Sequence, residues 1–157
     1  MNARDLMVQN VMTVTPDTTV AEIARVLTTY RLGSVPVVDD GGHLVGIVSE
    51  SDLFLKEKGI PYSAVKLPER FQQWVDAGRL AQIYEGARTH TAADVMTRCV
   101  HALPEDAPLS YAVSLLAHED VAQVPVVTSE GTVTGICHAL DLLRWFADGL
   151  GYKLTKR

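Results

Sequence analysis

Apolar residues recur at helical spacing in two separate stretches of the chain. In each stretch positions i, i+3, i+4 and i+7 are apolar, and this spacing places one hydrophobic stripe along a helix. The residues are Val20, Ile23, Ala24 and Leu27 in the first stretch and Leu109, Ala112, Val113 and Leu116 in the second. We therefore predict two amphipathic helices that bury these side chains.

Each predicted helix is followed by the pattern of a β-hairpin. A short β-branched run comes first, then turn residues that include glycine, and then a second apolar run. The predicted strands are 35–38 and about 43–48 in the first half of the chain, and 124–127 and about 132–137 in the second. A further helix is expected to begin at Ser49 and another at His138, the latter over about 139–149. Each half is therefore predicted as strand, helix, strand, strand, helix.

These elements recur at one fixed offset. A shift of 89 residues places residues 5–53 on residues 94–142 without a gap. The identical pairs include Asp5 and Asp94, Met7 and Met96, Val11 and Val100, the Val-Pro-Val-Val blocks at 35–38 and 124–127, Gly46 and Gly135, and Asp52 and Asp141. Such self-similarity indicates a duplicated unit, and a unit of about fifty residues buries little core alone. We therefore predict an α/β (α+β) module of two pseudo-twofold-related repeats packed sheet against sheet.

The predicted module is a single one, spanning 1–157, with repeat 1 at 5–55, an insert at 56–93 and repeat 2 at 94–150. The insert lacks a Gly/Ser-rich tract and contains the apolar residues Phe71, Trp74, Val75, Leu80, Ile83 and Tyr84. This pattern predicts two short helices, over 67–76 and 78–88, that pack on the module or on a partner. Trp74 and Trp145 are expected to be packing residues, and residues 151–157 a frayed basic tail.

The charge balance disfavours a generic nucleic-acid binder. The chain has 14 basic and 19 acidic residues, a net charge of −5, whereas affinity for nucleic acid depends on neutralising phosphates. No apolar run approaches the roughly 18 residues of a membrane span, and no signal peptide opens the chain. Cys99 and Cys137 form no disulfide framework, and Cys137 is expected to be a small buried hydrophobe. We therefore predict a soluble, cytoplasmic protein that binds neither nucleic acid nor membrane.

Catalytic and metal-binding signals are missing from the sequence. The five histidines, at positions 43, 90, 101, 118 and 138, do not have the spacing of metal ligands. The chain has no H-E-x-x-H motif, no nucleophile elbow and no G-x-x-x-x-G-K-[ST] loop. The prediction is therefore a protein that is not an enzyme, with no catalytic residue, no metal site and no required cofactor.

Three short patterns follow one another in both halves of the chain: Asp-x-Met, x-Pro-Val-Val and Gly-h-x-Ser-x-x-Asp, where h is apolar and the second copy of the last pattern has histidine in place of serine. This arrangement resembles a tandem cystathionine-β-synthase (CBS) domain pair, or Bateman module, of the stand-alone bacterial type, over residues 5–55 and 94–144. The resemblance implies regulatory binding of an adenosine-containing ligand, AMP, ADP or ATP, with S-adenosylmethionine, NAD(H) or cyclic dinucleotides as alternatives. AMP or ATP is the expected ligand, in an energy-sensing role. It further implies a homodimer that signals to an unidentified regulated protein.

The resemblance also implies two ligand sites, each in a cleft between the repeats. The first would use Ser49, Ser51, Asp52, Arg98, Cys99, Val100, His101, Val121 and Ala122. The second would use Asp141, His138, Met7, Asn10, Val11, Met12, Leu32 and Gly33. The second copy of the motif departs from the pattern, because His138 stands where serine is expected and Leu140 stands at the position of Ser51. Phosphate binding at the second site is therefore in doubt, and Asp52 marks the better site.

The residue types of the first site also fit a ligand without the resemblance. A carboxylate accepts hydrogen bonds from both ribose hydroxyls, and serines at a helix N-terminus suit a phosphate. Two alternatives stay open. In the first alternative, capping a helix is the whole role of Ser49 and Asp52. In the second, the chain is a ligand-free protein-interaction or dimerisation module that docks through the insert.

Overall fold

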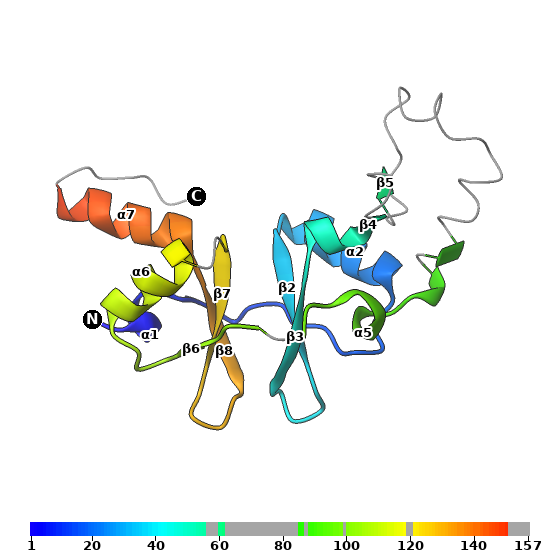
Figure 1. Cartoon of the computed structure of the whole chain (residues 1–157), viewed down its shortest axis with the longest axis horizontal. Coiled ribbons are helices and arrows are strands. Elements are labelled where there is room, and N and C mark those ends of the chain that lie inside the picture. Colours follow the sequence, from blue (N-terminus) through cyan, green and yellow to red (C-terminus); the bar gives the residue numbers. More distant parts are fainter. Residues whose placement is uncertain (56–59, 62–84, 87, 99, 119–120, 151–157) are drawn as a thin grey trace. The chain divides into compact units, whose positions relative to one another are not determined.

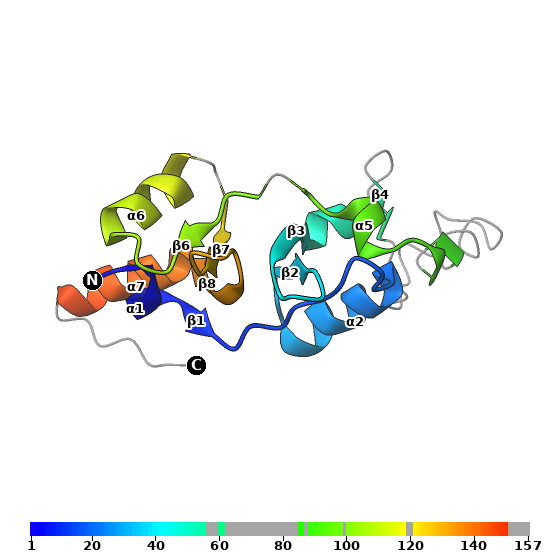
Figure 2. The same cartoon turned by 90° about the horizontal axis from the view of Figure 1, so that it is seen from below.

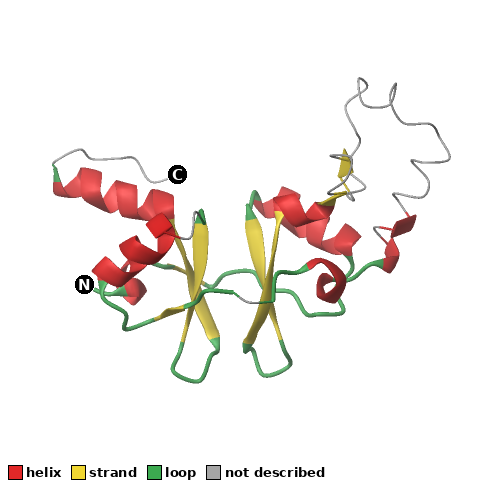
Figure 3. Ribbon diagram, viewed as in Figure 1, coloured by secondary structure: helices red, strands yellow, loops and turns green. Residues whose placement is uncertain are grey.

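The structure is a computed structural model of the chain, and it describes residues 1–55, 60–61, 85–86, 88–98, 100–118 and 121–150. Two compact units make up the chain, and each contains segments from both halves of the sequence. The repeat-1 unit consists of Met12–Asp40 and Val45–Val100, and the repeat-2 unit of Met1–Val11, Gly41–Leu44 and His101–Arg157. Both units combine helices with strands (Figure 3), which confirms the predicted α/β class.

The repeat-1 unit is built around one hairpin. Its elements are α2 (Val20–Tyr30), β2 (Ser34–Val38), β3 (Leu44–Ser49), the 3₁₀ helix η1 (Glu50–Leu53), β4 (Phe54–Leu55), β5 (Ile60–Pro61) and α5 (Ala92–Val95). β2 pairs with β3, and β4 pairs with β5 in a separate two-stranded sheet. Helices α2 and α5 lie on the same side of the hairpin (Figures 1 and 2). The predicted first helix and both strands of the hairpin are therefore confirmed.

Helix α2 forms where its capping and apolar pattern predict it. The Thr19 hydroxyl accepts a hydrogen bond from the Glu22 backbone N–H at 3.2 Å, which caps the first turn. Arg31 ends the helix in the left-handed region, at φ 53°. The four stripe residues that the sequence predicts are all buried, together with the hairpin residues that face them: Val20, Ile23, Ala24, Leu27, Val35, Val37 and Val48.

The repeat-2 unit contains a mixed four-stranded sheet. Its elements are α1 (Ala3–Leu6), β1 (Val8–Gln9), β6 (Leu103–Pro104), α6 (Leu109–His118), β7 (Gln123–Val127), β8 (Val133–His138) and α7 (Ala139–Gly149). The strand order is β1-β8-β7-β6, with β6–β7 parallel and the other pairs antiparallel. Helices α6 and α7 lie on the same side of this sheet (Figures 1 and 2). The predicted second hairpin is confirmed.

The buried face of α6 differs from the predicted one. Ala112, Leu115 and Leu116 are buried in the core of the repeat-2 unit, but Val113 is 46% exposed, so its predicted burial is wrong. The three buried residues point toward the sheet on one narrow stripe. Val113 lies about 100° round the helix from Ala112 and therefore falls at the edge of that stripe.

The opening segment of each repeat pairs with the hairpin of the other repeat. Strand β1, which precedes repeat 1's helix, is antiparallel to β8, with Val8 opposite Ile136. In the repeat-1 unit, Thr97 pairs in the same way with Ile47, through N–H···O bonds of 3.0 Å in both directions. Because 8 and 97 differ by the repeat offset of 89, the two exchanges are equivalent. Each compact unit therefore consists of one repeat's hairpin and the other repeat's first segment.

The predicted helices that follow the hairpins are not equivalent. The helix expected from Ser49 is only a four-residue 3₁₀ turn that gives way to β4. The helix expected from His138 is α7, over Ala139–Gly149 as predicted, but none of its residues is buried, and the predicted packing role of Trp145 is wrong, since it is 43% exposed. The helix predicted over 67–76, most of that over 78–88, Trp74, and the tail at 151–157 lie outside the described residues. No helix in the described part is long and apolar enough to span a bilayer.

Candidate functional site

The first Gly-h-x-Ser-x-x-Asp motif brings three predicted site residues together at the end of β3. Ser49 donates to Asp52 Oδ2 twice, from its backbone N–H and from its hydroxyl, both at 2.8 Å. The Ser49 and Ser51 hydroxyl oxygens are 2.9 Å apart. Among the described residues the other carboxylate oxygen, Oδ1, has no hydrogen-bond partner. The capping contact that the sequence left open is therefore present, and it leaves one carboxylate oxygen for a ligand.

The second motif holds its aspartate with an imidazole and a guanidinium instead of hydroxyls. His138 Nδ1 lies 3.0 Å from Asp141 Oδ2, and Arg144 Nη1 donates to Asp141 Oδ1 at 3.2 Å. His138 is also the N-cap of α7 and makes no side-chain cap bond. Sequence reasoning missed Arg144, although its spacing of three residues from Asp141 on a predicted helix was the available signal.

The glycine of each motif is required by a methionine from the exchanged segment. A Cβ atom at Gly46 would lie 2.5 Å from Met96 Sδ, and one at Gly135 would lie 2.5 Å from Met7 Sδ. The Gly46–Met96 contact lies within the repeat-1 unit, and the Gly135–Met7 contact lies within the repeat-2 unit. The methionine of Asp-x-Met therefore packs against the glycine of Gly-h-x-Ser-x-x-Asp in both units. Met7, a predicted site residue, is the methionine of one of these contacts.

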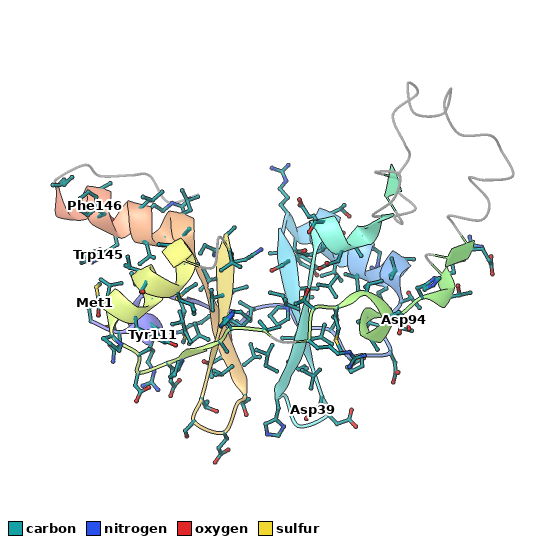
Figure 4. The ribbon with its side chains drawn as sticks, viewed as in Figure 1. Met1, Asp39, Asp94, Tyr111, Trp145 and Phe146 are labelled. Atoms are coloured by element: carbon teal, nitrogen blue, oxygen red, sulfur yellow. The ribbon has the colours of Figure 1, made fainter. Side chains whose placement is uncertain are left out.

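The aspartate of each Asp-x-Met pattern caps a short helix. Asp94 Oδ2 accepts from the Thr91 backbone N–H at 2.8 Å and from its hydroxyl at 3.2 Å, at the start of α5 (Figure 4). These hydrogen bonds, the backbone one first, lower the pKa of the Asp94 carboxyl. Asp5 accepts from the Asn2 backbone N–H at 2.9 Å at the start of α1. The pattern therefore has a local structural role in both copies.

The other predicted site residues are divided between the two units. For the first site, Arg98 and Val100 lie in the same unit as Ser49, Ser51 and Asp52, whereas the repeat-2 unit contains His101, Val121 and Ala122. For the second site, the unit that holds His138 and Asp141 also contains Met7, Asn10 and Val11, whereas the repeat-1 unit contains Met12, Leu32 and Gly33. Cys99 lies outside the described residues. Both sites as complete sets therefore stay predictions.

Two of these residues have local features of their own. Arg98 donates from Nη2 to the Ala93 carbonyl at 2.9 Å, a contact that holds the guanidinium against α5. Asn10 has φ 55°, a left-handed conformation that asparagine tolerates better than most residues. The Arg98 contact uses one of the five guanidinium N–H donors and leaves the others for a phosphate.

The described part of the repeat-2 core contains one buried thiol. Cys137 is 2% exposed, as predicted for a small buried hydrophobe. Burial, and to a lesser extent the charge of Asp141, raises the pKa of its thiol to about 11. In the part of the chain that the structure describes, no three His, Cys, Asp or Glu side chains are grouped as metal ligands would be.

The chain matches the family model of the CBS domain twice, over residues 3–58 and 92–148. It is 28% identical over 142 residues to inosine-5′-monophosphate dehydrogenase from Methanocaldococcus jannaschii, covering 90% of this chain but only 23% of that enzyme. The chain thus spans about a quarter of the length of this relative.

Solved structures share the fold over most of the chain. The CBS domain of a CBS domain-containing membrane protein from Sphaerobacter thermophilus has a TM-score of 0.77 and 31% identity, covering 91% of this chain and 86% of that one. CBSX2 from Arabidopsis thaliana in complex with AMP has a TM-score of 0.70 and 23% identity, covering 95% and 98%. The CBS domain pair of protein MJ0100, in complex with 5′-methylthioadenosine and S-adenosyl-L-methionine, has a TM-score of 0.65 and 24% identity, covering 95% and 98%.

Proposed function

The chain belongs to the CBS domain family, and on that premise we propose that it is a non-catalytic regulatory sensor of adenosine-containing ligands. The observation that carries the proposal is the cluster of Ser49, Ser51 and Asp52 at the end of β3, with one oxygen of Asp52 unpartnered among the described residues. Support comes from two related CBS pairs, of which one binds AMP and the other 5′-methylthioadenosine and S-adenosylmethionine.

In the proposed complex, Asp52 accepts hydrogen bonds from the ribose hydroxyls, and the Ser51 hydroxyl donates to the phosphate. The Ser49 hydroxyl donates to the phosphate only after it exchanges its bond to Asp52 for one to the ligand. The apolar side chains of Val100 and Val121, both in repeat 2, would line the adenine. AMP or ATP is the proposed ligand, with S-adenosylmethionine and NAD(H) as alternatives. The ligand would bridge the repeats and transmit its signal by favouring one relative orientation of them, to the extent of its differential affinity for the two states.

Thermal unfolding with and without ligand tests this proposal. The panel is AMP, ADP, ATP, S-adenosylmethionine and NADH, added to the full chain. A ligand present at about a hundredfold over its Kd adds roughly 2.7 kcal/mol to the free energy of unfolding, which raises Tm by several degrees. Asp52→Asn should lose most of the shift, whereas the matched control Asp17→Asn, at an exposed position outside both predicted sites, should keep it. An equal shift in Asp52→Asn and the parent would remove the assigned role of Asp52.

We also propose that the chain forms a homodimer through an exposed apolar face on the repeat-2 unit. Helix α7 presents four large residues that are 55–63% exposed, which we call the α7 apolar face: Leu140, Leu143, Phe146 and Leu150. Trp145 on α7, Tyr111 on α6 and Met1 add further exposed apolar surface at this end of the unit (Figure 4). Seven such side chains, each exposing on the order of 100 Å², approach the roughly 800 Å² that one partner buries in a standard interface.

The competing hypothesis, a ligand-free interaction module, predicts docking through the insert, most of whose residues lie outside the described part of the chain. The α7 apolar face favours a self-association surface on repeat 2 instead. The cytoplasmic location and the regulated partner protein stay predictions from the sequence.

A further inference from the structure

The two motif copies hold their aspartates with donors of different charge. Asp52 receives both of its hydrogen bonds on one oxygen, from the neutral groups of Ser49. Asp141 receives one charged or chargeable donor on each oxygen, His138 on Oδ2 and Arg144 on Oδ1. At the repeat offset of 89, His138 occupies the position of Ser49 and Arg144 that of Leu55. Among the described residues, these contacts are therefore found in repeat 2 alone.

These contacts leave neither oxygen of the Asp141 carboxylate without a donor. Ribose hydroxyls donate to carboxylate oxygens. The Asp141 side chain is only 18% exposed, so solvent screens its contacts incompletely. A ribose approaching Asp141 must share or displace a donor on either oxygen, whereas Oδ1 of Asp52 has no hydrogen-bond partner among the described residues.

The pairs can open without unwinding the helix. Asp141 does not cap α7, because the helix has no side-chain cap bond at its N-terminus. By contrast, Asp52 bonds the Ser49 backbone N–H and is part of the local chain geometry. The contacts of Asp141 with His138 and Arg144 are thus side-chain contacts only, and a ligand can exchange with them.

We infer that His138 and Arg144 compete with a ligand ribose for the Asp141 carboxylate, so that the second site binds more weakly than the first. This inference rests on the proposed function, because it concerns the second of the two proposed nucleotide sites. On this inference, the contacts of His138 and Arg144 with Asp141 determine the affinity of the second site for its ligand. A sensor of this kind responds to its ligand in two concentration ranges, one for each site.

Calorimetric titration with AMP tests the inference on the full-length chain. The starting variant is Asp52→Ala, which removes the first site. Adding His138→Ser and Arg144→Leu then gives Asp141 the surroundings that Asp52 has in repeat 1. We expect the triple variant to bind AMP about tenfold more tightly than Asp52→Ala. Arg144→Lys in the same background keeps the charge and should give no such gain, and Asp52→Ala/Asp141→Ala should not bind.

Thermal unfolding without ligand shows whether each variant is folded, and the single exchange Arg144→Leu replaces the triple variant if that one does not fold. Equal or weaker binding in the folded exchange variant would overturn the inference, while Asp52-dependent binding in the parent would leave the proposed function intact. A parent chain that binds neither AMP nor any other ligand of the panel would overturn the proposed function itself.

Discussion

The two repeats are alike up to the end of the hairpin and differ after it. In both, the residue after the second strand donates its backbone N–H to the same carbonyl position, Glu50 to Gly33 at 3.0 Å and Ala139 to Ala122 at 2.9 Å. Beyond this bond repeat 1 continues as a four-residue 3₁₀ turn and a short strand, and repeat 2 as an eleven-residue helix. The shared motif therefore determines how the strand ends but does not determine which secondary-structure element follows it.

The residues that follow explain the difference. No glycine or proline occurs between His138 and Gly149, and the segment is rich in alanine and leucine, which favour helix. After Ser49 the sequence reaches Gly59 and Pro61 within twelve residues, and both disfavour a helix interior. Strand β4 pairs with β5, which contains that proline. The helix of repeat 2 therefore presents a long apolar face that is absent from the described part of repeat 1.

The glycine–methionine contact is where the two repeats are most alike, and breaking it should have the largest effect. Gly46→Ala and Gly135→Ala each place a Cβ atom 2.5 Å from a methionine sulfur, with a backbone carbonyl at 2.9–3.0 Å as well. The methionine can move, but the carbonyl cannot move freely. We expect each substitution to cost about 1–3 kcal/mol in the free energy of unfolding, measured by urea denaturation.

Gly149→Ala is the matched control, because a Cβ at that position meets nothing within 4 Å. It lies at the end of α7 and should change stability by at most about 1 kcal/mol, in the stabilising direction. Equal stability of Gly46→Ala, Gly135→Ala and the parent would contradict the packing role of the exchanged methionines.

The α7 apolar face is where the two repeats are least alike. Leu143→Glu places a charge at the middle of this face, where Leu143 is 63% exposed. If the face is a dimer interface, the substitution should shift the chain from dimer to monomer in light scattering coupled to gel filtration, because a charge in a dry interface is left unpaired. Tyr30→Glu, at a residue of α2 that is 56% exposed, is the control and should leave the oligomeric state unchanged. A parent chain that is monomeric at high micromolar concentration would rule out the proposed dimer.

The thiol of Cys137 tests the burial of the repeat-2 core. With its pKa raised to about 11 and its side chain buried, it should react with a disulfide reagent at pH 8 only as the protein unfolds. A Cys99→Ser background leaves Cys137 as the single thiol, since the chain has two cysteines. Reaction in native protein at the rate seen in urea would show that this core is open to solvent.

Asp94 should give the smallest effect, because it lies at the surface. Its pKa is lowered in the folded chain, so its stabilising contribution is present above the unfolded pKa and is lost as the pH falls through the folded value. The difference in stability between the parent and Asp94→Asn should therefore be largest near neutral pH and shrink below about pH 4. Thr91→Val, which removes only the hydroxyl donor, should give a smaller difference than Asp94→Asn. A difference that does not depend on pH would contradict the assigned hydrogen bonds.

Features that depend on residues close in sequence could be predicted from the sequence alone. Ser49 and Asp52 are three residues apart, and that spacing at a strand end predicted a helix cap. In the structure the Asp52 carboxylate accepts from the backbone N–H of Ser49, which is a capping contact, and also from its hydroxyl. The buried stripe of α2 followed from its period in the same way. Where the local signal was ambiguous, as at Val113 on the edge of a stripe, the prediction was wrong. The three-residue spacing of Arg144 from Asp141 on a predicted helix was a local signal that would have predicted their contact.

The sequence by itself determined the duplication, the two hairpins, and helices α2 and α7, because the duplication follows from self-similarity and the other elements follow from patterns that are local in the chain. Only the tertiary structure decided that β1 pairs with β8, that Met7 packs on Gly135, and that α7 leaves its apolar face exposed. Met7 and Gly135 are separated by most of the chain, and no spacing in the sequence records which distant segments come into contact. That choice is made by packing, where a strand edge is filled by whichever segment satisfies its backbone groups and fits its surface.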